Sequence, residues 1–514
     1  MSIENEEASV AANNKRIAKN TIVLYIRMIF MMGVSLFTSR VILQTLGVED
    51  FGIYSVVGGI ITMFAIINGG MVSATQRFIT FEIGKGNIEK LRTVFSTSLQ
   101  IHGLISILIV LLGETVGLWF LYEKMVIPEN RMVAAMWVYQ CSIIACVVNI
   151  MSIPYNADIV AHEKMSAFAY ISIIEVSLKL IIVYMLLITP WDKLIVYSLL
   201  LLMVQLSIRF VYSHYCHRHF EETKYHHQFN ELLFKEMVSF AGWSFLGNFA
   251  SVLYTQGLNL LLNVFFGPVV NAARGIAVQV QGALHQFVAN FQMALNPQIT
   301  KTYAAGELEQ MHSLMFRSAR FSFFLLFFFT LPVLFETNFI LELWLGKVPI
   351  NTVVFTRLML VISLLFTLVN PLAVANQATG KVKRYQMIEG GILLLIVPIS
   401  YVVLKLDCKA YSVFIVHLII ECITQVFRMK ILVNQIHLSL LSYWKNVYFP
   451  VLAVVSISIF LPLVFYINVE EGWLRFFVVG LSSVISVAFT IFIIGLKGNE
   501  RSFLIEKVNN FIRK

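Results

Sequence analysis

The chain contains 514 residues, of which 58% are apolar and only 13% are charged. Soluble domains carry about 25% charged residues, so this chain has too little polar surface to cover a soluble globule of its length. Its 42 phenylalanines also exclude disorder, because disordered chains contain few aromatic residues. Helices satisfy their own backbone hydrogen bonds in lipid, and the composition therefore predicts an all-α polytopic membrane protein.

Apolar segments of about 20 residues, the length that crosses the hydrocarbon of a bilayer, recur along the whole chain. We predict fourteen transmembrane helices, at 20–44, 51–76, 93–122, 131–154, 165–189, 193–213, 237–265, 270–297, 314–335, 352–375, 385–404, 410–432, 447–467 and 473–495. The spans at 20–44 and 270–297 are the least apolar of the set. Residues 1–19 contain no apolar stretch beside a cleavage site, so we expect no signal peptide.

The net charge of +9 is distributed unevenly across the predicted connections. Most of the 38 Lys and Arg residues lie in the terminal segments and in the connections that follow every second span. Because positively charged loops stay in the cytoplasm, this bias predicts that both termini are cytoplasmic. It also accounts for the basic composition without nucleic acid as a partner. The tail at 497–514 mixes apolar and charged residues, which predicts a short amphipathic helix on the inner membrane surface.

A weak internal repeat relates the two halves of the chain. Residues 76–98 align without a gap on 296–318 at an offset of 220 residues. Residues 154–164 align on 371–381 at an offset of 217. This offset corresponds to six spans, so we predict that the halves are parallel repeats about an axis along the membrane normal.

The repeat and the charge bias together predict six regions. They are a cytoplasmic segment at 1–19, a six-helix bundle at 20–213, a cytoplasmic linker at 214–236, a second six-helix bundle at 237–432, two extra helices at 433–496 and a cytoplasmic amphipathic tail at 497–514. Parallel six-helix halves are typical of transporters that bind their substrate near the bilayer midplane and work by alternating access.

Two predicted spans carry polar stripes. On a helix, six residues of span 270–297 fall within one narrow sector: Asn271, Arg274, Gln281, His285, Gln292 and Asn296. Span 237–265 carries a second stripe that includes Asn248 and Asn259. Polar groups in hydrocarbon are costly, so such stripes face the bundle interior or water. For the first stripe we favour a wet lining; for the second, hydrogen bonding between helices in a dry core is an equal alternative.

Charged residues also lie inside other spans. The first span holds Arg27 and Arg40, whose separation places them on different faces, so that each either lines the interior or extends to the nearer interface. Two pairs have the i,i+4 spacing of helical partners: Glu175 with Lys179, and His417 with Glu421. The first pair favours simple ion pairing. Both pairs are candidates for coupling transport to an energy source. A buried pair such as His417 and Glu421 can carry a proton, because histidine titrates near neutrality.

Several kinds of site are disfavoured. The histidine-rich segment contains His214, His217, His219, His226 and His227, but these residues lack the regular spacing of metal ligands, so we expect no metal site. We also expect no cofactor, and the Walker A motif of ATP-hydrolysing proteins is missing. Glu49 and Asp50 resemble the acidic pair of a membrane glycosyltransferase, but the predicted outer loops are too short to hold a sugar substrate.

Four segments carry a family resemblance. They are LGVEDFGIYSVV at 46–57, NAARGIAVQVQGAL at 271–284, ALNPQITKTYAAGE at 294–307 and ANQATGKVKRYQ at 375–386. In order and spacing they resemble the motifs of the polysaccharide flippase family, which carries O-antigen and other lipid-linked oligosaccharides. This family belongs to the multidrug/oligosaccharidyl-lipid/polysaccharide exporter superfamily, and the resemblance covers roughly residues 15–435.

The resemblance implies a transporter and not an enzyme, with a cationic cavity between two six-helix bundles. The implied activity moves an undecaprenyl-pyrophosphate-linked oligosaccharide from the cytoplasmic to the periplasmic leaflet of a bacterial inner membrane, for surface polysaccharide or lipopolysaccharide synthesis. Multidrug antiporters of the superfamily use acidic residues, whereas Arg27 and Arg40 in the first span favour an anionic substrate. The alternatives are a cation-coupled multidrug antiporter and a membrane glycosyltransferase or glycan polymerase.

The implied partners are the lipid-linked oligosaccharide, membrane lipid and proteins of polysaccharide assembly, and we expect a monomer. The substrate-binding candidates are Arg274, Arg27, Arg40, Gln281, His285, Gln292, Asn296, Asn248 and Asn259.

Overall fold

The computed structural model describes residues 3–123, 127–224, 230–346, 348–502 and 505, and the regular structure in these ranges is helical. Among them, eleven helical segments are long and apolar enough to cross a membrane. The prediction of an all-α polytopic membrane protein is therefore confirmed. The count of fourteen is not, because the predicted spans 20–44, 51–76 and 270–297 have no counterpart among the eleven.

Contacts divide the chain into two units, Met1–Phe249 with Tyr303–Gly306, and Ala250–Thr302 with Glu307–Lys514. This division falls inside a helix, α7 (Glu231–Phe266), and not in the predicted linker at 214–236. The reason is close packing of the first half of α7 within the first unit. A Cβ atom at Gly70 would lie only 2.6 Å from the carbonyl oxygen of Ala241 and 2.9 Å from the amide of Phe245.

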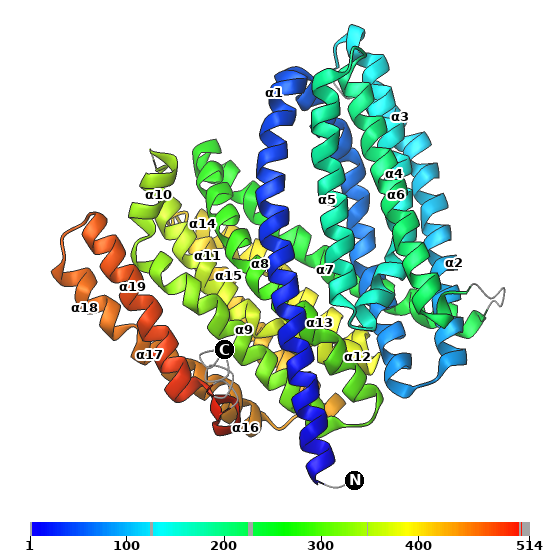
Figure 1. Ribbon diagram of the computed structural model, residues 1–514. Helices are drawn as coiled ribbons and strands as arrows, with labels where there is room; N and C mark the ends of the chain where they lie inside the picture. The colour runs from blue at the N-terminus through cyan, green and yellow to red at the C-terminus, as the bar shows by residue number, and fades with distance from the viewer. Residues whose placement is uncertain (1–2, 124–126, 225–229, 347, 503–504, 506–514) are drawn as a thin grey trace, which may run out of the picture. The chain divides into compact units, whose positions relative to one another are not determined.

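The first unit (Figure 1) is built from these helices: α1 (Ile3–Lys85), α2 (Ile88–Leu112), α3 (Leu118–Glu123), α4 (Met132–Ala161), α5 (Met165–Ile188), α6 (Lys193–His219) and the first part of α7. A π-helical turn at Gly113–Gly117 joins α2 to α3, so that both form one candidate span. Glycine is required there because a Cβ atom at Gly117 would lie 2.0 Å from the hydroxyl of Tyr139.

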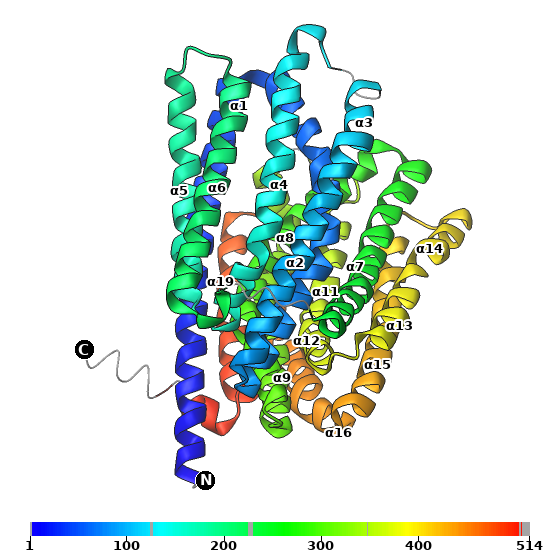
Figure 2. The ribbon, with the colours of Figure 1, turned by 90° about the vertical axis from the view of Figure 1, so that its right-hand side faces the viewer.

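Helix α1 contains 83 residues, which as a straight rod would be about 125 Å long, several times the thickness of the hydrocarbon. Figures 1 and 2 show that its ribbon instead reverses direction at the end opposite the N-terminus. Contacts agree: Asn20 bonds to Glu163 beyond the end of α4, whereas Asp50 pairs with Arg131 just before its start. The helix therefore runs along the unit twice. The pairing of Asp50 places this reversal near the predicted connection at 45–50, although these residues are helical and do not form a loop.

The second unit contains the rest of α7 and the following helices: α8 (Pro268–Ala304), α9 (Leu308–Phe335), α10 (Thr337–Leu345), α11 (Thr352–Thr367), α12 (Val369–Thr379), α13 (Val382–Leu394), α14 (Ile396–Lys405), α15 (Ser412–Ile436), α16 (Leu440–Tyr443), α17 (Phe449–Ser458), α18 (Phe460–Asn468) and α19 (Trp473–Thr490). Three candidate spans are interrupted, between α11 and α12, α13 and α14, and α17 and α18. The interruptions, at Leu368, Leu395 and Ile459, each lie three residues before a proline: Pro371, Pro398 and Pro462. Proline has no amide hydrogen and clashes with the preceding turn, which explains all three.

The predicted repeat aligns backbone turns that have the same geometry in the structure. Gly86 and Gly306 end α1 and α8 with φ angles of 69° and 81°, and each amide bonds to the carbonyl three residues earlier, at 3.1 and 3.0 Å. Glu163 and Gly380 occupy the second pair of matching turns with φ angles of 58° and 76°, and their amides make the same bond at 2.9 and 3.0 Å. The weak sequence matches therefore mark turns of the same geometry.

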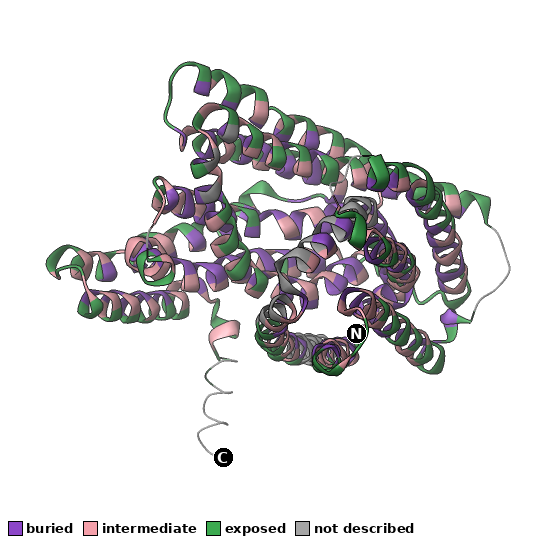
Figure 3. Cartoon of the chain, turned by 90° about the horizontal axis from the view of Figure 1, so that it is seen from above, coloured by how far each residue is buried: buried purple, intermediate pink, exposed green. Residues whose placement is uncertain are grey.

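The predicted extra helices belong to the second unit. Arg475 in α19 pairs with the buried Glu336 at 2.9 Å, and Glu500 pairs with Arg320 of α9 at 2.6 Å. Phe460 and Phe489 are exposed, as expected of lipid-facing positions, and Figure 3 shows buried and exposed residues on different sides of the helices. Most of the predicted amphipathic tail at 497–514 lies outside the described residues.

Candidate functional site

Arg274 is the charged residue of the polar stripe on α8, and it is buried with 7% of its surface exposed. One terminal nitrogen, Nη2, donates a hydrogen bond to the backbone carbonyl of Thr255 in α7, at 2.9 Å. Its Nε atom is buried and has no partner among the described residues. No carboxylate pairs with this guanidinium in the described part of the second unit, so its charge and part of its hydrogen-bonding capacity remain available to an anion.

The glutamines of the same stripe have local partners. Gln281 donates to the hydroxyl of Ser363 in α11 at 2.7 Å. Gln292 is buried and donates to the hydroxyl of Ser322 in α9 at 3.1 Å and to the carbonyl of Thr367 at 3.2 Å. These bonds fasten α8 to α9 and α11 by hydrogen bonding between helices.

The remaining polar-stripe residues, and the two asparagines predicted on α7, make fewer side-chain hydrogen bonds among the described residues. The ring of His285 is half-buried, with its centroid 6.3 Å from that of Phe366. The side-chain oxygen of Asn296 is buried without a partner among the described residues. The two asparagines of α7 fall in different units, Asn248 being exposed in the first and Asn259 half-buried in the second.

The interior of the second unit also contains a chain of ionisable groups. Arg428 in α15, with 1% of its surface exposed, donates to Glu421 at 2.5 Å and to Glu389 of α13 at 2.8 Å. His417 lies within electrostatic reach of both Glu421 and Arg274, and its ring centroid is 5.2 Å from that of Tyr254. The structure thus brings together Arg274, His417 and Glu421, which the sequence suggested separately.

Sequence reasoning missed Arg428 and Glu389, although both lie in predicted spans. A signal was present for Arg428, because it follows Glu421 by seven residues and therefore lies two turns along the same helix face. Glu421 is consequently not a simple partner of His417. Its carboxylate is engaged by a guanidinium, which limits its freedom to bind a cation.

The first unit holds a smaller charged cluster around Arg27. The guanidinium of Arg27 lies 4.4 Å from the ring centroid of Phe168, and its Nε atom has no partner among the described residues. Glu175 and Tyr212 are within its electrostatic reach. The predicted pair of Glu175 and Lys179 is present, at 2.6 Å. One carboxylate among two cations leaves this cluster net positive. The side chain of Arg40 lies outside the described residues.

The acidic pair considered for a glycosyltransferase has a different environment. Asp50 accepts hydrogen bonds from Arg131 at 2.8 and 2.5 Å, and Asp192 accepts another from the same guanidinium at 2.5 Å. Burial alone would raise the pKa of Asp192, but the bonds from Arg131 and from backbone amides hold that pKa below its usual value. Asp50 is therefore part of an ion-pair network and is not a free catalytic acid. The side chain of Glu49 lies outside the described residues.

The sequence of this chain was compared with protein-family models and with curated protein sequences. The chain matches the family model described as polysaccharide biosynthesis protein over residues 17–303. No curated protein sequence matches it.

Several solved structures share the fold. A MATE protein in the bent conformation has a TM-score of 0.72 at 12% identity, covering 83% of this chain and 96% of that one. An outward-facing MATE family multidrug resistance transporter of the MOP superfamily has a TM-score of 0.68 at 12% identity, covering 83% and 96%. A MOP superfamily transporter from Pyrococcus furiosus, whose binding pocket is described as having reverse polarity, has a TM-score of 0.64 at 11% identity, covering 82% and 97%.

At these identities the structural similarity shows the fold alone, which is that of MATE transporters. The family match extends over more than half of the chain and agrees with the resemblance seen in the sequence motifs. This multi-pass membrane protein belongs to the polysaccharide biosynthesis protein family.

Proposed function

We propose that the chain is a flippase that moves a lipid-linked oligosaccharide, joined to its polyprenyl carrier through a pyrophosphate, across a bacterial inner membrane. The observation that carries this proposal is the buried guanidinium of Arg274, which among the described residues has one carbonyl partner and an unpaired Nε atom. Its charge suits an anionic substrate. The family match to polysaccharide biosynthesis supports a glycan as the rest of the cargo.

The physical problem that such a protein solves is the passage of a charged and hydroxylated head group through hydrocarbon. Burying an unpaired charge or hydroxyl is very unfavourable. A guanidinium replaces the hydration of a pyrophosphate with charge-assisted, bidentate hydrogen bonds. The side chains of His285 and Asn296 offer further hydrogen bonds to sugar hydroxyls, while the polyprenyl tail remains in lipid. Alternating access then carries the head group to the other side.

The orientation follows from the distribution of charge. Lys and Arg residues concentrate on the side that holds both termini, which favours a cytoplasmic location for both ends. Transport from the cytoplasmic to the periplasmic leaflet is the direction needed to deliver glycans to the cell surface, including lipopolysaccharide. Export proceeds by a monomer that hands its cargo to polysaccharide assembly proteins.

Coupling to an energy source is assigned to the ionisable chain of the second unit. His417 interacts electrostatically with both Arg274 and Glu421, so proton transfer at His417 alters the field at the proposed anion site. The pair of Glu175 and Lys179 is the corresponding candidate in the first unit. The membrane potential, worth about 2.3 kcal/mol per charge per 100 mV, is sufficient to bias the movement of a charged head group.

A multidrug antiporter is the less favoured alternative for a specific reason. Binding of cationic drugs and coupling ions requires buried carboxylates that are free to accept them. Both carboxylates of the described network, Glu389 and Glu421, already accept hydrogen bonds from Arg428.

Deletion of the gene in its bacterial host tests the proposal. We expect loss of the surface polysaccharide and accumulation of its lipid-linked precursor inside the cell, with little change in sensitivity to cationic dyes. Normal surface polysaccharide together with hypersensitivity to those dyes would support the antiporter instead.

A further inference from the structure

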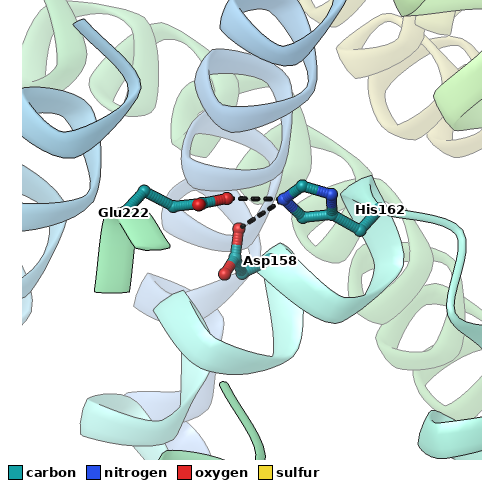
Figure 4. Close-up of side chains that lie close together, drawn as sticks. All are labelled: Asp158, His162 and Glu222. Carbon is teal, nitrogen blue, oxygen red and sulfur yellow. Dashed lines mark hydrogen bonds and ion pairs between the residues drawn. The ribbon is translucent and has the colours of Figure 1, made fainter. Parts of the chain in front are cut away.

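Three potential metal ligands meet at one end of the first unit (Figure 4). Asp158 lies in the last turn of α4, His162 caps the end of that helix, and Glu222 lies in a short turn, Glu221–Thr223, that follows α6. The Nε2 atom of His162 is 2.5 Å from a carboxylate oxygen of Glu222 and 3.7 Å from one of Asp158. All three ligand atoms lie within 4.8 Å of one another.

The burial of this cluster points to a bound cation. The side chain of Asp158 is 0% exposed and that of Glu222 only 3%. Neither carboxylate oxygen of Asp158 has a hydrogen-bond partner among the described residues. An unpaired buried carboxylate is strongly disfavoured. When both carboxyl groups are ionised, these two carboxylates beside one imidazole carry excess negative charge in either protonation state of the histidine.

Among the described residues, the nearby arginines make their hydrogen bonds and ring contacts outside the cluster. Arg92 lies within electrostatic reach of Glu222, but it donates its hydrogen bond to Glu221, at 3.1 Å. Arg209 lies over the ring of Tyr155, 4.1 Å from its centroid. The nearby thiol of Cys216 donates to the carbonyl of Tyr155. A divalent ion at the centre of the cluster would neutralise both carboxylates at once.

The internal repeat shows that the fold does not require these ligands. Asp158 corresponds to Ala375 and His162 to Thr379 in the matching segment of the second half. That segment forms the same turn, with the same backbone bond, and Ala375 is fully buried there. The acidic and imidazole groups are thus an addition to a turn that forms without them.

We propose that Asp158, His162 and Glu222 bind a divalent transition-metal ion of the Zn²⁺ type. Imidazole nitrogen and carboxylate oxygen are suitable ligands for Zn²⁺, and three protein ligands leave a fourth position for water. Tetrahedral Zn²⁺ places its ligand atoms about 3.4 Å apart. The separations of 2.5 and 3.7 Å between Nε2 of His162 and the two carboxylates lie on either side of this value. The ring of His162 is already oriented by stacking on Phe220, with centroids 4.2 Å apart.

The consequence of binding is local and structural. The ion would join the end of α4 to the turn after α6, which lies within the predicted linker at 214–236. The spacing of residues within the histidine-rich segment alone did not indicate a metal site. Two of the proposed ligands come instead from α4 and its cap. The site does not depend on the transported substrate, so it stands or falls separately from the proposed function.

Metal binding to the purified full-length protein tests the site. After treatment with a chelator, the protein is titrated with Zn²⁺ against a chromophoric competitor, and Co²⁺ is used to report tetrahedral coordination by its visible spectrum. We expect one ion per chain, a tetrahedral Co²⁺ spectrum and a rise in the thermal midpoint on binding. A wild-type protein that binds neither ion would overturn the proposal.

The variant Asp158→Ala reproduces the residue found at the matching buried position, Ala375, and is therefore expected to fold. Removal of a residue that only hydrogen-bonds to a metal ligand typically lowers metal affinity by about 10–100-fold. Because Asp158 is a proposed ligand itself, the affinity of this variant for Zn²⁺ should fall further than that. Glu222→Gln should do the same while keeping the size of the side chain. His219→Ala, at an exposed residue of the histidine-rich segment, is the matched control and should bind normally. Loss of binding in that control, with retention in Asp158→Ala, would place the ion elsewhere.

Discussion

Arg274 and Arg428 are both buried arginines of the second unit, yet their surroundings differ. Arg428 donates to two carboxylates, those of Glu421 and Glu389, at 2.5 and 2.8 Å. Arg274 donates to one backbone carbonyl and keeps a buried nitrogen without a partner among the described residues. A buried charge that is matched inside the protein holds helices together, whereas an unmatched one is available to a ligand. The partners of an arginine, more than its burial, separate the two roles.

The largest expected effect comes from breaking the matched arginine. Arg428→Ala leaves two buried carboxylates without compensation, and loss of one partner from a buried pair costs about 3–5 kcal/mol of stability. We expect a large drop in the thermal midpoint of the detergent-solubilised protein, measured by size-exclusion chromatography after heating.

Removal of the whole network is the control for this change. Arg428→Met combined with Glu389→Gln and Glu421→Gln leaves no buried charge and should recover most of the lost stability. If the single variant is as stable as the wild type, or the triple variant is no more stable than the single one, the comparison between the two arginines is wrong.

The second effect concerns transport and not stability. Arg274→Ala should lower surface polysaccharide in a deletion strain by about tenfold or more at unchanged protein level, because charge-assisted hydrogen bonds to the anion are lost. Arg274→Lys keeps the charge without the bidentate fork and should retain partial transport. Normal transport by the Ala variant would make Arg274 a structural residue like Arg428.

Arg131 extends the comparison to the first unit, where a second guanidinium is matched by two carboxylates. Glu49→Gln combined with Asp50→Asn should leave transport nearly intact, because Asp50 serves an ion pair and not catalysis. The ion pair is partly exposed, so we expect a stability loss of about 1 kcal/mol or less in thermal unfolding. Complete loss of polysaccharide at normal protein level would revive the glycosyltransferase hypothesis.

The smallest effect is a pH dependence at Asp192. The pKa of Asp192 is lowered in the folded protein. Its pairing with Arg131 therefore stabilises the fold at pH values above the pKa that Asp192 has in the unfolded chain. This stabilisation is lost as the pH falls through the pKa of Asp192 in the folded protein. The thermal midpoint of Asp192→Asn should therefore lie slightly below that of the wild type at pH 7, and the gap should close below about pH 4. A gap that widens in acid would contradict the assignment.

Much of the fold could be predicted from the sequence, because span length and hydrophobicity act locally. Every one of the eleven candidate spans overlaps a predicted one. The continuity of α1 through 45–50 could not be predicted, since a polar stretch at the end of a span looks like a loop. The repeat aligns Gly86 with Gly306, and both glycines have the left-handed backbone that glycine favours.

The candidate sites were only partly predictable. Arg274 and His417 were found as polar groups in apolar spans, a signal that a single sequence carries. The link between Arg428 and Glu389 joins different helices, and Glu222 lies sixty residues from His162, so periodicity could not reveal either contact. The partners of Gln281 and Gln292 likewise depend on how α8 packs against α9 and α11.

Reconstitution of the purified protein in vesicles tests the central claim most directly. The vesicles contain either a polyprenyl-pyrophosphate-linked oligosaccharide or a cationic dye, and transfer between leaflets is followed by accessibility of the sugar to an external glycosidase. The wild type should move the oligosaccharide and not the dye, Arg274→Ala should lose this activity, and Glu49→Gln with Asp50→Asn should keep it. Dye export driven by a cation gradient, without movement of the oligosaccharide, would contradict the account.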